Sequence, residues 1–144
     1  GVEGFKKDFP EAKVIANINE KEMLGDKNFN MSMQFGQPTE IDADIYVDDS
    51  DEMEVAGMNL KFIFTPGHSP GGMCVYIADE KTLFSGDTLF QSSIGRTDFP
   101  GCSFSDLADA VHEKLWLLPD DTSVFPGHMG PTTIGFEKEN NPFV

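Results

Sequence analysis

The first residues of the chain carry apolar side chains at a helical spacing. Val2, Phe5 and Phe9 follow one another at three and four residues, and Pro10 ends the segment. This spacing predicts a helix over residues 2–9 with one apolar stripe, which needs a surface to pack against.

The next segment alternates between short apolar runs and polar stretches. Residues 13–16 predict a short buried strand. Residues 19–24 predict a short helix with Asn17 or Asn19 as its N-cap and Gly25 at its end. Residues 28–38 show no clear period and predict a loop. Residues 40–54 carry eight acidic side chains and no basic one, which is typical of a solvated face and turn.

Strand patterns follow in quick succession in the middle of the chain. Residues 52–55 and 60–64 flank Ala56-Gly57 and predict a hairpin. Residues 73–77 are continuously apolar, as expected of a strand covered on both faces. Further strands are predicted at residues 82–85 and 122–125.

One longer helix is predicted near the end of the chain. Leu107, Val111, Leu115 and Leu118 repeat at i, i+4, i+8 and i+11. Ser103, with Asp106 three residues later, resembles a capping box, and Pro119 closes the segment.

The length and charge of the chain limit what it can be. Its 144 residues, with 39% hydrophobic content, suffice for one domain with its own core, over residues 1–144. The balance of 25 acidic against 10 basic residues gives a net charge of -15, which disfavours nucleic acid and anionic membranes as partners. Cys74 and Cys102 do not form a disulfide framework, and we expect a reducing cytoplasm. Cys74 lies in an apolar run and is expected in the core.

Three short motifs collect residues that carry chemistry. They are TPGHSPGG around His68, SGDTLF around Asp87 and FPGH ending at His128. In each, an apolar strand runs into a turn that contains glycine, with one potential metal ligand at the end of the strand. Imidazoles and a carboxylate are ligands of zinc, iron or manganese, so these three residues predict a metal site. His112 lies inside the predicted helix and is expected to be structural.

Four motifs in order carry a resemblance to a known family. TPGHSPGG, SGDTLF, SIGRTDFPG and FPGHMGPTTIGFEKENNPF together resemble the metallo-beta-lactamase superfamily, and more narrowly the glyoxalase II-like hydroxyacylglutathione hydrolases. The resemblance implies an α/β fold of the αβ/βα sandwich type with a site for two metal ions, usually zinc, at one edge. It implies that His68 binds the first metal, that Asp87 bridges both and that His128 binds the second.

The same resemblance implies that a ligand motif is absent from this chain. Relatives carry a His-x-His-x-Asp-His signature before a helix that begins much like residues 1–5, whereas this chain contains no His-x-His. We therefore expect an N-terminally truncated sandwich with weak metal occupancy and impaired activity. A catalytic zinc needs three protein ligands and an open position, and two histidines with one shared aspartate fall short for two sites.

The expected activity is metal-dependent hydrolysis of a small-molecule thioester. Two alternatives remain open: an iron-dependent persulfide dioxygenase-like protein, which residues 95–99 also resemble, and a non-catalytic remnant or interaction module. Arg96, the only arginine, is expected to pair with a local acid such as Asp98.

The missing strands also predict an assembly. We expect an unpaired strand edge and an uncovered apolar sheet face, and therefore a homo-oligomer in which a second copy covers that face.

Overall fold

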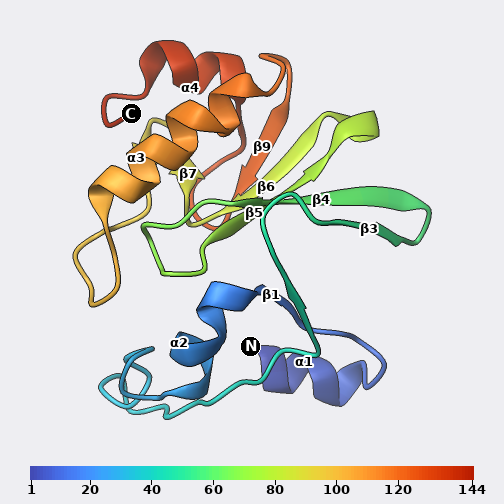
Figure 1. Ribbon diagram of the computed structural model, residues 1–144, viewed down its shortest axis with the longest axis vertical. Helices are drawn as coiled ribbons and strands as arrows, with labels where there is room; N and C mark the ends of the chain where they lie inside the picture. Colours follow the sequence, from blue (N-terminus) through green and yellow to red (C-terminus); the bar gives the residue numbers. More distant parts are fainter.

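The computed structural model describes all 144 residues and places a six-stranded sheet at its centre (Figure 1). The strands lie in the order β10-β9-β6-β5-β4-β3. Their bounds are β3 Glu52–Val55, β4 Met58–Phe64, β5 Met73–Ile77, β6 Thr82–Gly86, β9 Ser123–Pro126 and β10 Thr132–Thr133. Strands β3 to β6 pair antiparallel in succession, whereas β9 lies parallel to β6. Strands β4, β6 and β9 therefore run in the same direction and end at the same edge of the sheet.

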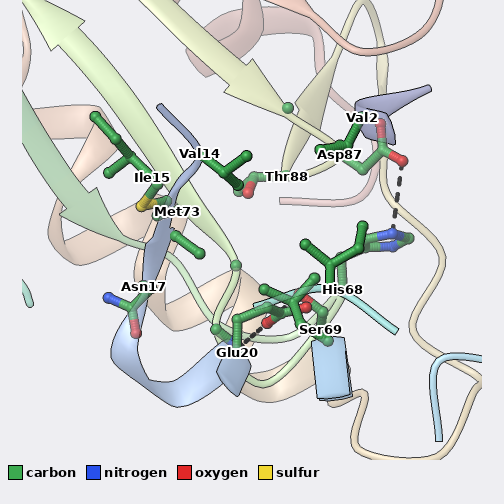
Figure 2. Close-up of a pocket in the computed structure, with 16 residues that line it drawn as sticks. Val2, Val14, Ile15, Asn17, Glu20, His68, Ser69, Met73, Asp87 and Thr88 are labelled. Atoms are coloured by element: carbon green, nitrogen blue, oxygen red, sulfur yellow. Dashed lines mark hydrogen bonds and ion pairs between the residues drawn. The ribbon is translucent and has the colours of Figure 1, made fainter. Parts of the chain in front are cut away.

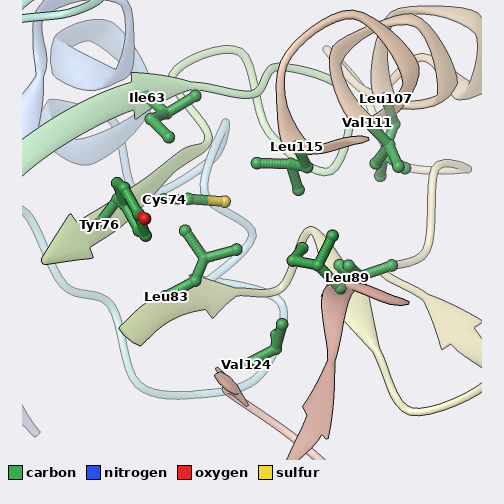
Figure 3. Packing of buried hydrophobic residues seen from close by; sticks show 10 residues of the cluster. Ile63, Cys74, Tyr76, Leu83, Leu89, Leu107, Val111, Leu115 and Val124 are labelled. Carbon is green, nitrogen blue, oxygen red and sulfur yellow. The ribbon is translucent and has the colours of Figure 1, made fainter. Parts of the chain in front are cut away.

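Two helices and a short hairpin lie on one face of this sheet and form the core with it (Figures 1 and 3). These elements are α3 Phe104–Glu113, α4 Ile134–Asn140, the 3-10 turn η3 Leu115–Leu117, and the hairpin of β7 Leu89–Phe90 and β8 Ser93–Ile94. The core cluster consists of Ile63, Cys74, Tyr76, Leu83, Leu89, Leu107, Val111, Leu115, Val124 and Ile134. The alternation along the strands sends these side chains toward the helices.

The opposite face of the sheet leaves large apolar side chains exposed. Val75, Phe84 and Phe125 are cross-strand neighbours on β5, β6 and β9. The rings of Phe84 and Phe125 stack with centroids 5.8 Å apart and remain 48% and 42% exposed. This exposed row agrees with the expected uncovered face.

The first 47 residues form a separate layer on the other side of the sheet from α3 and α4 (Figure 1). This layer contains α1 Val2–Asp8, β1 Ile15–Asn17, the 3-10 turn η1 Ile18–Glu20, α2 Lys21–Gly25 and β2 Ile45–Val47. Strands β1 and β2 pair in parallel, so the layer has its own short sheet rather than one long unpaired strand edge. Within this layer, Asp44 links the segment before β2 to α1 and to the segment before β1, because its Oδ2 accepts from Lys6 Nζ at 2.7 Å and from the Val14 amide at 2.8 Å.

Most of the predicted elements are confirmed. The first helix covers residues 2–8, and Phe5 and Phe9 stack at 4.8 Å while remaining more than half exposed. The hairpin has Ala56 and Gly57 at positive φ, as a two-residue turn requires. Cys74 is fully buried, and His112 lies on α3 with its ring edge-on to Trp116.

Three predictions are corrected by the structure. The long helix ends at Glu113, because Lys114 leaves the helical region and its Nζ donates to the Phe64 carbonyl at 2.7 Å and to Asp49 at 2.9 Å. The first strand spans residues 15–17 rather than 13–16. The acidic stretch 40–54 is not entirely a solvated turn, because it contains the unpredicted strand β2 and, at its end, the first three residues of the predicted strand β3.

Another feature concerns membranes. None of the helices combines the length and the apolar character that a membrane crossing would need.

Candidate metal centre

The three motifs end at one edge of the sheet. His68 follows β4 after a tight turn, and Asp87 is the residue directly after β6. His128 follows β9 with one residue in between. Because these strands run in the same direction, their ends bring the three side chains together. The expected convergence is confirmed; the role of the three residues as metal ligands stays a prediction.

Asp87 lies between the two imidazoles. Its Oδ2 is 3.5 Å from His68 Nε2, and its Oδ1 is 2.9 Å from His128 Nδ1. The His68 and Asp87 side chains are about 30% exposed, whereas His128 is 70% exposed. One carboxylate thus serves two imidazoles, with a different oxygen on each side.

A backbone carbonyl orients the His68 ring. His68 Nδ1 lies 2.9 Å from the Arg96 carbonyl oxygen, which can only accept, so Nδ1 carries the hydrogen. In the neutral ring, Nε2 then presents a lone pair to the Asp87 carboxylate. A proton or a metal ion between Nε2 and the carboxylate would join these two groups, and a second-sphere bond such as that at Nδ1 is typical of metal-binding histidines.

Two glycines permit the close approach of these groups. A Cβ at Gly95 would collide with the Asp87 carbonyl, and a Cβ at Gly127 would collide with Asp87 Oδ1. Gly127 is the residue before His128, so the short route from β9 to this histidine depends on the absence of a side chain there.

Two buried threonines hold the turns at His68 and Asp87 together. Thr65 Oγ1 and Thr88 Oγ1 are hydrogen-bonded at 2.9 Å, and both residues are buried. They connect the turn before His68 to the turn after Asp87. Burial raises the pKa of the neighbouring Cys74 thiol to about 11, so this cysteine stays neutral and belongs to the core rather than to the ligand set.

Imidazole and carboxylate groups suit a metal ion, but only a few such side chains lie close together. Nowhere in the chain do three histidine, cysteine, aspartate or glutamate side chains form a group that could hold one ion. The arrangement instead provides two imidazole–carboxylate pairs that share Asp87. Each pair offers two potential ligands, fewer than the three protein ligands of a catalytic zinc, and their role as ligands stays a prediction.

A cavity of about 390 Å³ opens beside His68 and Asp87 (Figure 2). The N-terminal layer forms its other wall through Val2, Val14 and Ile15. Glu20 closes the cavity at the His68 turn, since its Oε2 accepts from Ser69 Oγ at 3.0 Å and from the Gly71 amide. Neither this role of Glu20 nor that of the Arg96 carbonyl could be predicted from the sequence, because both depend on contacts between segments far apart along the chain.

The side chain of Arg96 is committed to a local pair. Its Nε and Nη2 donate to the two oxygens of Asp98 at 2.7 Å each, which confirms the expected pairing. The same hydrogen bonds lower the pKa of Asp98 and raise that of Arg96. Arg96 also lies over the Phe99 ring, 3.6 Å from its centroid.

Comparisons of the sequence place the chain among known proteins. The Metallo-beta-lactamase superfamily matches residues 1–128. The probable metallo-hydrolase YqgX of Bacillus subtilis is 38% identical over 133 residues, which are 91% of this chain and 63% of the relative. The hydroxyacylglutathione hydrolase GloC of Haemophilus influenzae is 37% identical over 135 residues, or 90% of this chain and 63% of the relative. The chain thus spans less than two thirds of the length of either relative.

Comparisons of the structure agree. The BLEG-1 B3 metallo-beta-lactamase superposes with a TM-score of 0.89 at 36% identity, over 99% of this chain and 69% of that one. TTHA1623 in a di-iron-bound form superposes with a TM-score of 0.82 at 27% identity, over 99% of this chain and 70% of that one. ETHE1 from Myxococcus xanthus superposes with a TM-score of 0.75 at 29% identity, over 96% of this chain and 54% of that one. With its α/β fold and its strand-end histidines and aspartate, the chain belongs to the metallo-beta-lactamase superfamily.

Proposed function

We propose that this chain supplies one side of the active site of a metal-dependent thioester hydrolase, of the hydroxyacylglutathione hydrolase-like type. The observation that carries the proposal is Asp87, which presents one carboxylate oxygen to each of two imidazoles. The likeness to a relative named hydroxyacylglutathione hydrolase supports the substrate class.

His68, Asp87 and His128 would hold the metals, with zinc as the first candidate. A bound metal lowers the pKa of its water and polarises the substrate carbonyl. The residues of the chain orient this chemistry: Arg96 fixes the His68 ring through its carbonyl, and Gly127 lets His128 approach Asp87. Because each pair lacks further ligands, we propose that the chain alone binds metal weakly and that its activity is impaired.

Iron is the second candidate for the metal. A neighbour at 27% identity is described in a di-iron-bound form. The segment from Gly95 to Phe99 also resembles persulfide dioxygenases, so an iron-dependent dioxygenase is the alternative function. A non-catalytic interaction module is the third.

The compartment and partners are proposals as well. Both cysteines are free thiols, which favours a reducing compartment, and we propose the cytoplasm. The partner is a small thioester, and a second copy of the chain is proposed for the exposed sheet face. The net charge of -15 argues against nucleic acid and anionic membranes.

An activity assay on matched variants separates these candidates. The chain is dialysed, analysed for metal, and assayed with added zinc or iron(II) for thiol release from a hydroxyacylglutathione and for oxygen consumption with a persulfide. We expect little metal after dialysis and slow, zinc-dependent thiol release that is lost in Asp87→Asn and kept in the surface control Asp79→Asn.

The other outcomes decide against the hydrolase. Oxygen consumption that depends on iron, without thiol release, favours the dioxygenase. Neither activity at millimolar metal favours the non-catalytic module. Two tightly retained metal equivalents would contradict the weak half-sites.

A further inference from the structure

A second cavity of about 310 Å³ lies next to His68. It shares Glu20, His68 and Ser69 with the cavity of Figure 2, so the two meet at the candidate metal centre. Its character is different, because apolar side chains dominate its walls. These side chains are Met23, Phe29, Met31, Phe35 and Phe99.

One wall is a loop held in shape by polar bonds rather than by a core. Between α2 and β2, the Asn30 side chain donates to the Thr39 carbonyl at 3.0 Å, and the Thr39 amide donates to Ser32 Oγ at 2.9 Å. The chain therefore orders the loop without burying its apolar residues, and Phe35 remains 73% exposed. Compact loops of this kind frequently carry function.

The other wall is fastened to the candidate metal centre. Cys102 Sγ donates to the His68 carbonyl at 2.8 Å. The Phe29 ring reaches across to the same segment, since a Cβ at Gly101 would lie 3.1 Å from its Cζ. The cleft between the two walls is thus held in a fixed position relative to His68.

The chemistry of the walls selects an apolar, uncharged group. No lysine or arginine side chain lines the cleft, and Glu20 is its one acidic residue. The Arg96 guanidinium over the Phe99 ring is already paired with Asp98, so a carboxylate on the ligand would find no unpaired lysine or arginine there. Methionine and phenylalanine give an apolar surface, and the flexible thioether of methionine adapts to ligands of different shape.

We propose that this Met/Phe cleft binds the acyl group of the substrate, and that the preferred thioesters carry an unbranched or aryl apolar acyl chain without a terminal charge. This inference rests on the proposed thioester hydrolase function. Each methylene that enters the cleft should tighten binding about fourfold until the cleft is filled.

The test measures binding without chemistry. Thioethers of N-acetylcysteamine cannot be hydrolysed, and S-ethyl, S-hexyl and S-(5-carboxypentyl) forms differ only in the group that would enter the cleft. Titration calorimetry on the full chain should give at least tenfold tighter binding for S-hexyl than for S-ethyl, and weaker binding for the carboxylate form.

Matched variants locate the binding. Phe35 is exposed, so Phe35→Ser should leave the fold intact and reduce S-hexyl affinity at least threefold, while the exposed Phe143 serves as control in Phe143→Ser. Equal affinity for S-ethyl and S-hexyl would overturn the proposal. So would S-hexyl binding that is lost in Phe84→Ser but kept in Phe35→Ser, because the ligand would then lie on the exposed sheet face.

Failure of the cleft and failure of the hydrolase give different results. If zinc-dependent thiol release occurs at the same rate for acetyl and hexanoyl thioesters, the cleft inference is wrong and the hydrolase stands. If S-hexyl binds through Phe35 and no thioester is hydrolysed, the cleft binds apolar ligands and the hydrolase is wrong.

Discussion

Asp87 carries more of the candidate site than any other residue, since each of its two oxygens faces one imidazole. Its position was predictable because the SGDTLF motif places a carboxylate at the end of an apolar strand, between two Pro-Gly-His turns. The orientation of His68 was not predictable. It is set by the backbone carbonyl of Arg96. Because every residue has such a carbonyl, the sequence does not show which one meets His68.

The approach of β9 to Asp87 can be tested at Gly127. A methyl group there would collide with Asp87 Oδ1, so Gly127→Ala should displace the carboxylate from its shared position. We expect zinc affinity to fall about tenfold, as when a supporting contact of a metal ligand is removed, with little change in stability. Calorimetric zinc titration is the measurement. Gly130→Ala is the control, because the new Cβ meets only the flexible Gln91 side chain; equal effects of the two would contradict the geometry.

Cys74 gives a prediction of pH dependence. Burial raises the pKa of its thiol from 9.0 to about 11, so the unfolded chain loses this proton first as pH rises. The stability that the neutral thiol contributes is present below pH 9 and is lost as pH rises toward 11, by about 2 kcal/mol. The free energy of unfolding of the wild type, compared with that of Cys74→Ala, should therefore fall between pH 9 and 11. Parallel pH curves would show that the thiol is not desolvated.

Helices and strands with a clear apolar period were predictable from the sequence. Those whose few apolar residues lie among acidic or turn-forming residues were not. The apolar run 73–77 and the hairpin turn at Ala56-Gly57 both appear where expected. Strand β2 could not be predicted, because its three residues lie between acidic residues whose pattern is typical of a solvated turn. The early end of α3 depends on Lys114, whose side chain reaches residues 50 and 65 positions away. The last helix, α4, was missed because it is short and follows Pro131 and two threonines.

The start of α3 offers a test of local structure. Ser103 Oγ accepts from the Asp106 amide and caps the helix that covers the core. Ser103→Ala should lower the free energy of unfolding by about 1 kcal/mol. Urea denaturation measures this, with Asp109→Ala, at an exposed position of the same helix, as control. A loss of the same size in both variants would assign the effect to general helix propensity instead of the cap.

In the molecule as a whole, one face of the sheet is left uncovered at Phe84 and Phe125. Exposing apolar surface costs about 25 cal/mol per Å², so several hundred Å² cost several kcal/mol, against a typical domain stability of about 5–15 kcal/mol. The charge and composition indicated a single globular domain. The exposed row itself could be inferred only from the family resemblance, because the strand pattern shows which residues share a face but not what covers them.

This face should make the chain associate in solution. We expect light scattering on dilute protein to report a dimer or larger species. The double variant Phe84→Ser, Phe125→Ser should shift it toward the monomer, and Phe104→Ser, an equally exposed phenylalanine on α3, should not. A wild-type monomer with a cooperative melt would show that the exposed row is tolerated by the isolated chain.

Diffraction at the zinc absorption edge tests whether the Asp87 carboxylate is shared between two metal ions. Crystals of the chain soaked in millimolar zinc should show anomalous peaks at Asp87, one on the side of His68 and one on the side of His128. The soak allows weak half-sites to fill. Peaks confined to the acidic stretch 40–54, with none at Asp87, would show that this carboxylate does not bind metal.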